Sequence, residues 1–228
     1  MNGPALLVVA HGSSHPDAAA AVTALANQVT RLAPVLDVRV AYLQHGEPSL
    51  TDALAEAGPS PVVVPLLLST GYHLTTDVAA AAERVTGPLG PDRLLVTALA
   101  ARLAEAGAPV GTPVVLAAAG SSDPQARGQV QAQADMLAAE IGSPVVVGFA
   151  AAGQPSVPEA VATLRERTGR PVAIASYLLA PGRFHDGLHD AGADWVSEPL
   201  ADHPAVAAVI IDRYRTGRMS PAPARSHY

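Results

Sequence analysis

Short runs of valine and leucine alternate along the chain with longer alanine-rich stretches whose apolar residues recur at helical spacing. The short runs predict buried strands, at residues 5–10, 38–43 and 62–67, followed by a weaker strand at 93–97. The longer stretches predict helices, at residues 16–32, 49–57, 75–85 and 99–106. Continuous apolar strands separated by helices are typical of a parallel sheet that is covered on both faces. Right-handed crossovers then give an open α/β layer fold.

Several short motifs occur twice, in the same order. Residues 10–16 read AHGSSHP and residues 118–124 read AAGSSDP. Residues 46–49 read GEPS and residues 153–156 read GQPS. Because these matches keep a nearly constant offset, they indicate an internal duplication of one α/β unit.

The duplication predicts two similar lobes, each an open parallel sheet flanked by helices. Residues 1–108 form the N-terminal lobe and residues 113–218 the C-terminal lobe, with a glycine- and proline-rich linker at 107–113. We expect the polar, proline-containing tail at residues 219–228 to be disordered.

The reactive residues of the first repeat have blander counterparts in the second. The matched pairs are His11 with Ala119, Glu47 with Gln154, and His73 with Phe184 or, after a shift of one residue, His185. The N-terminal lobe is therefore expected to carry the chemistry, while the C-terminal lobe forms the opposite wall of a cleft.

His11, Glu47 and His73 each follow one of the three predicted strands of the N-terminal lobe. The carboxyl ends of parallel strands meet at one edge of a sheet, where ligands bind in open α/β folds. Neutral imidazoles and a carboxylate bind divalent transition metals, and a histidine is also suited to accept a proton. The three residues thus form a candidate catalytic site, with His11 and His73 as the metal ligands.

The segments that carry these residues resemble one known family. VVAHGSS, YLQHGEPSL and VVVPLLLSTGYHLTTDV are similar to the class II chelatases of sirohydrochlorin, which are ATP-independent cobalto- and ferrochelatases. The resemblance extends over nearly the whole chain and implies a two-lobed α/β lyase that binds the macrocycle in its cleft. It implies that His11 accepts protons and binds metal, that His73 is the second metal-binding histidine, and that Glu47 lies at the substrate site.

The same resemblance implies that the loop before and including His73 lines the macrocycle. The substrate-binding residues are then Glu47, Leu68, Ser69, Thr70, Gly71, Tyr72 and His73. Because the substrate is a polycarboxylate, arginines are candidates for gripping it. Among Arg39, Arg127 and Arg183, we expect Arg183 to be the best placed, since its loop mirrors the one before His73.

Other polar residues near the site have simpler interpretations. His45 is expected to be a solvated turn residue, and His15 a residue at a helix N-terminus. Asp77 could orient His73 or simply lie on a wet helix face, and both readings stay open. His185 and His189, four residues apart, are expected to be surface histidines, and whether they assist the reaction stays open.

Composition limits the other classes of function. The net charge of −6 argues against a nucleic-acid binder, and the lack of cysteine excludes disulfides and thiolate metal sites. The first apolar run is too short for a signal peptide or membrane span, so we expect a cytoplasmic protein without a membrane partner. A duplicated chain can build its cleft alone, which favours a monomer. No tightly bound cofactor is expected.

The sequence therefore predicts insertion of a divalent metal into sirohydrochlorin, for sirohaem or cobalamin biosynthesis. Fe²⁺ is slightly favoured over Co²⁺, because no tract for storing a scarce metal is present. The alternative is a non-catalytic α/β module that binds a tetrapyrrole or another anion. A histidine phosphatase is disfavoured, because Ala10 stands where its motif needs an arginine.

Overall fold

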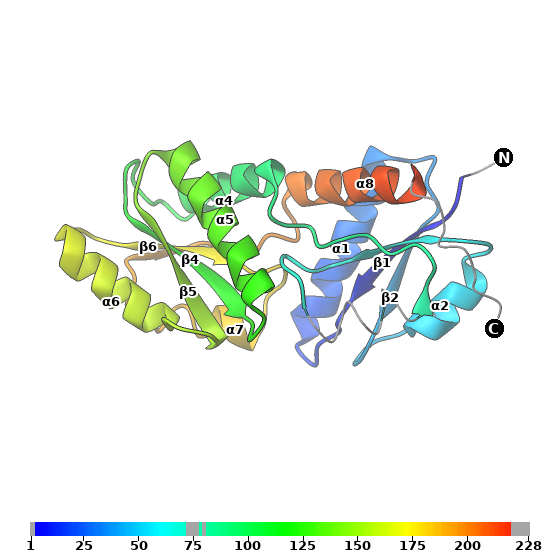
Figure 1. The fold of residues 1–228 in the computed structure, drawn as a ribbon, viewed down its shortest axis with the longest axis horizontal. Helices are drawn as coiled ribbons and strands as arrows, with labels where there is room; N and C mark the ends of the chain where they lie inside the picture. The colour runs from blue at the N-terminus through cyan, green and yellow to red at the C-terminus, as the bar shows by residue number, and fades with distance from the viewer. Residues whose placement is uncertain (1–2, 72–77, 79–80, 220–228) are drawn as a thin grey trace.

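The computed structural model describes residues 3–71, 78 and 81–219, which form two α/β lobes side by side (Figure 1). The elements of the first half are β1 (Leu6–Ala10), α1 (Pro16–Leu32), β2 (Val38–Tyr42), α2 (Leu50–Glu56), β3 (Val62–Pro65) and α4 (Arg93–Glu105). Those of the second half are β4 (Val114–Gly120), α5 (Pro124–Ile141), β5 (Val145–Ala152), α6 (Val157–Thr168), β6 (Ala173–Tyr177), α7 (Arg183–Asp186), β7 (Trp195–Val196) and α8 (Pro204–Met219).

Each lobe is built on a parallel sheet with its first strand inside. The first sheet has the order β2-β1-β3, and the second has the order β5-β4-β6-β7. All described strand pairs are parallel, and helices flank both sheets. The predicted fold class, two similar α/β lobes with parallel sheets, is confirmed.

The two repeats use the same local devices to start their helices. The His15 side chain accepts a hydrogen bond from the Asp17 N–H at the start of α1, and Asp123 does the same for Gln125 at the start of α5. Ser49 and Ser156 cap α2 and α6 in the same manner. A side-chain oxygen or nitrogen that satisfies an unpaired N–H fixes where a helix begins. The His15 prediction is confirmed.

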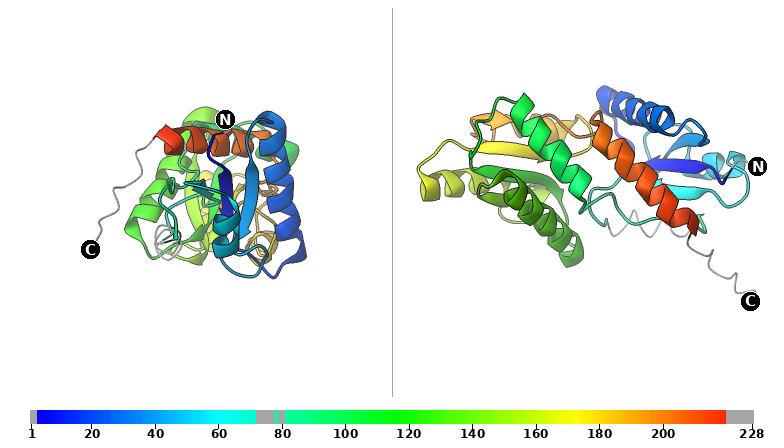
Figure 2. Two further views of the ribbon diagram at one scale, coloured as in Figure 1. Left: turned by 90° about the vertical axis from the view of Figure 1, so that its right-hand side faces the viewer. Right: turned by 90° about the horizontal axis from the view of Figure 1, so that it is seen from above.

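The last helix of each half packs against the sheet of the other half. Helix α4 contacts β6 and α5, whereas α8 contacts β3 and α1 (Figures 1 and 2). The two helices also contact each other. The two sequence repeats are therefore not the two packed bodies, because each repeat contributes one helix to its neighbour.

This exchange joins the two lobes through one apolar core. Buried residues of both sheets belong to one continuous cluster, which includes Leu6 and Val64 of the first sheet and Leu116 of the second. Separate clusters lie on the other face of each sheet, around Val9 in one lobe and Ile174 in the other. Apolar burial is the main stabilising contribution in folding, so the lobes share much of their stability.

One predicted element was wrong, and another was too long. Residues 93–97 are not a strand but the first part of α4, because Asp92 caps a helix there and accepts the Leu94 N–H at 2.9 Å. A short apolar run cannot by itself distinguish a strand from a buried helix. The predicted helix at 75–85 is helical at Val78 and Ala81, and the Ala82 N–H donates to the Val78 carbonyl at 3.1 Å. At its end, however, Val85 forms a parallel bridge with Val63. Residues 75–77, 79 and 80 lie outside the described part.

At the C-terminus, α8 includes Met219, the first residue of the predicted tail, and residues 220–228 lie outside the described part. Among the described residues, no helix is both long enough and apolar enough to cross a bilayer.

Candidate functional site

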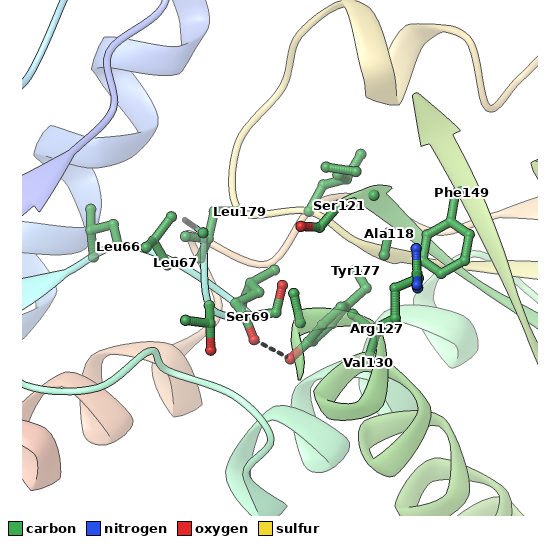
Figure 3. A pocket seen from close by; sticks show the side chains of 17 residues that line it. Leu66, Leu67, Ser69, Ala118, Ser121, Arg127, Val130, Phe149, Tyr177 and Leu179 are labelled. Carbon is green, nitrogen blue, oxygen red and sulfur yellow. Dashed lines mark hydrogen bonds between the residues drawn. The ribbon is translucent and has the colours of Figure 1, made fainter. Parts of the chain in front are cut away.

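Three adjoining cavities form a cleft between the carboxyl edges of the two sheets. The first, of about 260 Å³, lies between the loop after β3 and the ends of β4 and β6 (Figure 3). The second, of about 140 Å³, surrounds His11, and the third, of about 660 Å³, lies between the start of α1 and residues 178–185. Leu179 lines all three, so we treat them as one site, the interlobe cleft.

His11 is the first residue after β1, the middle strand of its sheet, and its side chain is exposed. Its carbonyl accepts the Gln44 N–H at 2.9 Å, which ties the loop to the one after β2. Gly12 makes this approach possible: its φ is +92°, and a Cβ atom there would lie 1.5 Å from the Gln44 carbonyl oxygen. The sequence therefore presents His11 to solvent from a constrained loop.

His45 lines the same cavity as His11. It is an exposed turn residue, as predicted, and its φ of +48° places it in the left-handed region. The other described residues that line this cavity are small or apolar, apart from Ser13 and the hydroxyl of Tyr42. His45 was not assigned to the site from the sequence, although its position directly before the GEPS motif was a usable signal.

Glu47 lies in the loop after β2 and is exposed. It shares the sheet edge with His11, but it is not among the described residues that line the three cavities. Tyr72, His73 and Asp77 lie outside the described residues. The structure thus brings His11 together with His45, and the proposed roles of Glu47 and His73 stay predictions.

The loop that leads to His73 is held by residues of the other repeat. Leu68, Ser69, Thr70 and Gly71 all line the first cavity. The Tyr177 hydroxyl donates a hydrogen bond to the Leu68 carbonyl at 2.8 Å (Figure 3). Gln129 Oε1 accepts hydrogen bonds of 2.7 Å from both the N–H and the hydroxyl of Thr70.

Tyr177 is suited to hold this loop as a permanent donor. Burial raises the pKa of its hydroxyl, the nearby Asp92 carboxylate raises it further, and Arg213 partly opposes this. The hydroxyl therefore stays protonated wherever the protein is folded.

The charged groups of the cleft are basic. Arg127 lines the first cavity and Arg183 the third, and both are exposed. None of the described lining residues is an aspartate or glutamate. In a chain whose net charge is −6, this segregation gives the cleft a local field that attracts anions.

His185 is not a surface residue, contrary to the prediction. It is 6% exposed, and its Nε2 lies 3.2 Å from the Ser197 carbonyl, which can only accept a hydrogen bond. The short helix α7 turns it inward beside the buried Leu188. His189 is exposed as predicted, and its ring meets the His185 ring edge-on at 5.2 Å.

Within residues 3–71, 78 and 81–219, no three histidine or carboxylate side chains gather closely enough to hold a metal. His11 and His45, both on the N-terminal lobe, face the cleft as imidazoles that could pass a metal or a proton to a bound ligand.

A duplicated α/β chain with a histidine-bearing, cation-lined cleft between two parallel sheets has the architecture of the two-lobed chelatases. Within that class the chain belongs to the CbiX family, which matches it twice, over residues 5–106 and 113–217. The two matches coincide with the two repeats, and the resemblance drawn from the motifs is confirmed.

Individual relatives agree with this assignment. The chain is 27% identical to the sirohydrochlorin ferrochelatase of Bacillus subtilis (strain 168), over 92% of its own length and 90% of that protein. The solved structure of SirB from Bacillus subtilis with Fe³⁺ superposes with a TM-score of 0.79 at 26% identity, over 95% of this chain and 96% of that one. CbiX, described as the terminal enzyme for biosynthesis of sirohaem in denitrifying bacteria, gives a TM-score of 0.68 at 26% identity, covering 93% and 98%.

Proposed function

We propose that this protein inserts a divalent metal into sirohydrochlorin without ATP, as a lyase of the CbiX family. The observation that carries the proposal is the interlobe cleft, where His11 stands at the end of a central strand among apolar and basic lining residues. A polycarboxylate macrocycle needs both an apolar surface for its ring and positive charge for its rim. A relative matched over 92% of this chain and 90% of its own length is a sirohydrochlorin ferrochelatase.

Metal insertion requires that two pyrrole N–H protons leave the macrocycle. His11 is exposed, so an imidazole there can accept a proton and release it to water. The His11 backbone is held by the Gln44 N–H and by the turn at Gly12, and this restricts the positions that its imidazole ring can take. We propose that His11 is the proton acceptor and, with His73, brings the metal to the ring, while Glu47 supplies negative charge at the rim.

Fe²⁺ and Co²⁺ are both substrates that such a site can take, and we retain iron as the favoured metal. A relative has been solved with Fe³⁺ bound. Two imidazoles and a carboxylate do not discriminate strongly between the two ions, so supply in the cell decides. Sirohaem biosynthesis is then the favoured pathway, with cobalamin biosynthesis as the cobalt-dependent one.

The decisive experiment is anaerobic turnover, followed by the absorption change of the macrocycle. Substoichiometric protein should accelerate insertion of Fe²⁺ or Co²⁺ over many cycles. His11→Ala should lower the insertion rate by at least about a hundredfold, the usual size of general base catalysis, without loss of fold. His189→Ala, which removes an exposed histidine elsewhere, is the matched control. A spectral shift that stops at one equivalent of protein would instead indicate the non-catalytic tetrapyrrole binder.

A further inference from the structure

The His11 cavity has a structural counterpart in the other repeat. Five identical pairs of small or β-branched residues line the two cavities at equivalent positions, namely Ala10 and Ala118, Gly12 and Gly120, Ser13 and Ser121, Ala18 and Ala126, and Val22 and Val130. Tyr42 and Phe149 supply the equivalent aromatic ring, each packed against the glycine of its own GxPS motif. The first cavity of the cleft is therefore the duplicated copy of the cavity that holds His11.

These copies differ in their ionisable side chains. His11 and His45 both line the cavity of the first repeat, whereas Ala119 stands in place of His11 and no histidine is among the described residues that line the copy. Arg127 stands where the first repeat has Ala19, so the copy has gained a permanent positive charge. The second repeat is therefore not simply a version of the first without its functional residues, because at this position it carries a charged side chain where the first repeat has alanine.

The surroundings of Arg127 do not explain its charge. Its guanidinium forms no ion pair with any carboxylate of the described residues, and its one hydrogen bond, to the Ser122 carbonyl, is long at 3.4 Å. It lies in the first turn of α5, where the helix dipole disfavours a cation and favours an anion. A bound anion would satisfy both the guanidinium and the helix terminus.

The remaining lining of this cavity suits a flat apolar body. Ten of its described residues are alanine, leucine, valine or phenylalanine, and Arg127 is the one charged residue among those described. The Tyr177 hydroxyl is already committed to Leu68. In Figure 3, Arg127 and Phe149 lie at the end of the pocket opposite Leu66, so charge is found at one end and aliphatic surface at the other.

We propose that Arg127 holds a peripheral carboxylate of the tetrapyrrole, while His11 works on the ring nitrogens from the facing cavity. This inference rests on the proposed function for the identity of the ligand. It makes Arg127 a binding and specificity residue that selects macrocycles with carboxylate side chains. The two copies of the cavity then have different roles: the first-repeat copy transfers protons and metal, and the second-repeat copy recognises the anion.

The test separates binding from insertion. Metal-free sirohydrochlorin is titrated against the intact protein by fluorescence, and KM and kcat are measured separately with Co²⁺. Arg127→Ala should raise Kd and the KM for sirohydrochlorin about fivefold, the upper size for a solvent-accessible charge pair, with kcat and the KM for metal unchanged. Arg127→Lys should retain most of the affinity, and Arg127→Glu should weaken binding further. The difference between wild type and Arg127→Ala should shrink at high salt.

Arg31→Ala is the matched control, since it removes an exposed arginine from the far end of the equivalent helix α1. If Arg127→Ala binds metal-free sirohydrochlorin as tightly as the wild type, the inference is overturned even when insertion proceeds. If the wild type binds but never turns over, the proposed function fails, while a binding defect in Arg127→Ala still supports the anion site. A wild type that does not bind the macrocycle overturns both.

Discussion

At the scale of single residues, the site depends on glycines that let two loops touch. Gly12 and Gly120 both have positive φ, of +92° and +103°, and both leave no room for a side chain. A Cβ at Gly120 would lie 2.0 Å from the Ala152 carbonyl oxygen, and one at Gly12 would be closer still to Gln44. The turn that presents His11 to the cleft therefore depends on the residue after it, Gly12.

We predict that Gly12→Ala destabilises the protein by at least about 2 kcal/mol, because the new Cβ meets backbone and not a movable side chain. Gly128→Ala is the opposite case, since Gly128 lies within α5 with nothing within 4 Å of its Cβ position. That change should be neutral or should stabilise by about 0.5–1 kcal/mol. Urea unfolding of both variants checks the pair, and equal stabilities would contradict the role given to Gly12.

At the scale of elements, the loop before His73 is positioned from across the cleft. Tyr177, at the end of β6, is 2% exposed and donates to the Leu68 carbonyl. Tyr214 of α8, which is 1% exposed, donates a similar bond of 2.7 Å to the Pro4 carbonyl at the start of the first repeat. The two tyrosines have the same chemistry, but only one of them holds a residue of the cleft.

Tyr177→Phe and Tyr214→Phe should therefore cost similar stability and differ in activity. Each leaves a backbone carbonyl without its partner, which costs about 1–2 kcal/mol. Tyr177→Phe should also slow metal insertion, because a loop that lines the cleft is released, whereas Tyr214→Phe should retain the wild-type rate. Thermal unfolding and turnover measured on the same samples check this. Equal activities would show that the loop does not need this bond.

The residue before helix α8 is a histidine, His203, whose titration should affect the stability of the protein. The Ala205 N–H donates to His203 Nδ1 at 3.2 Å. Burial lowers the pKa of His203, as does the nearby Arg102 charge, while Glu105 and Asp202 oppose this. The folded protein therefore binds this proton less readily than the unfolded chain does. The contribution of His203 to the free energy of unfolding is fully present above the reference pKa of about 6.5. It is lost as the pH falls through the lowered pKa of the folded state.

We predict that His203→Asn loses less stability than the wild type between pH 7 and pH 5. Asparagine keeps a side-chain acceptor for the helix start but does not titrate. His189→Asn, at an exposed position, should follow the wild-type curve. Chemical unfolding at a series of pH values measures all three proteins, and parallel curves for wild type and His203→Asn would contradict the assignment.

At the scale of the whole molecule, the parts that sequence predicted well are those with a local cause. The apolar runs around Val8 and Val63 and the duplicated GSS and GxPS motifs indicated both parallel sheets and the position of His11. The inward turn of His185 depends on packing between distant segments, so no local pattern revealed it. The helix at Arg93 had a local signal in its cap, Asp92, but the short apolar run after it also fits a strand. Aligning the two repeats places Arg127 opposite an alanine, but only the structure shows that Arg127 lines a cavity of the cleft.

The exchange of α4 and α8 is the largest feature that the duplicated sequence hid. Each repeat looks like a complete folding unit in the sequence. However, α8 of the second repeat packs against β3 and α1 of the first, and it adds Val206, Ile210 and other buried residues to the core there. Arg102 of α4 pairs with Asp202, which precedes α8, and so ties the two exchanged helices together. Neither repeat has a complete apolar cover without the other.

This arrangement predicts that the repeats fold together and not separately. A fragment of residues 1–108 should lack a cooperative unfolding transition, because its sheet keeps an apolar face that α8 would cover, and a fragment of residues 113–218 should lack the cover from α4. Mixed or co-expressed, the two fragments should assemble one to one and recover metal insertion. Circular dichroism, denaturant unfolding and sedimentation of each fragment and of the mixture test this. A monomeric fragment 1–108 that unfolds cooperatively would show that the first repeat is stable without helix α8. The shared core would then matter more for holding the two sides of the cleft together than for the stability of the fold.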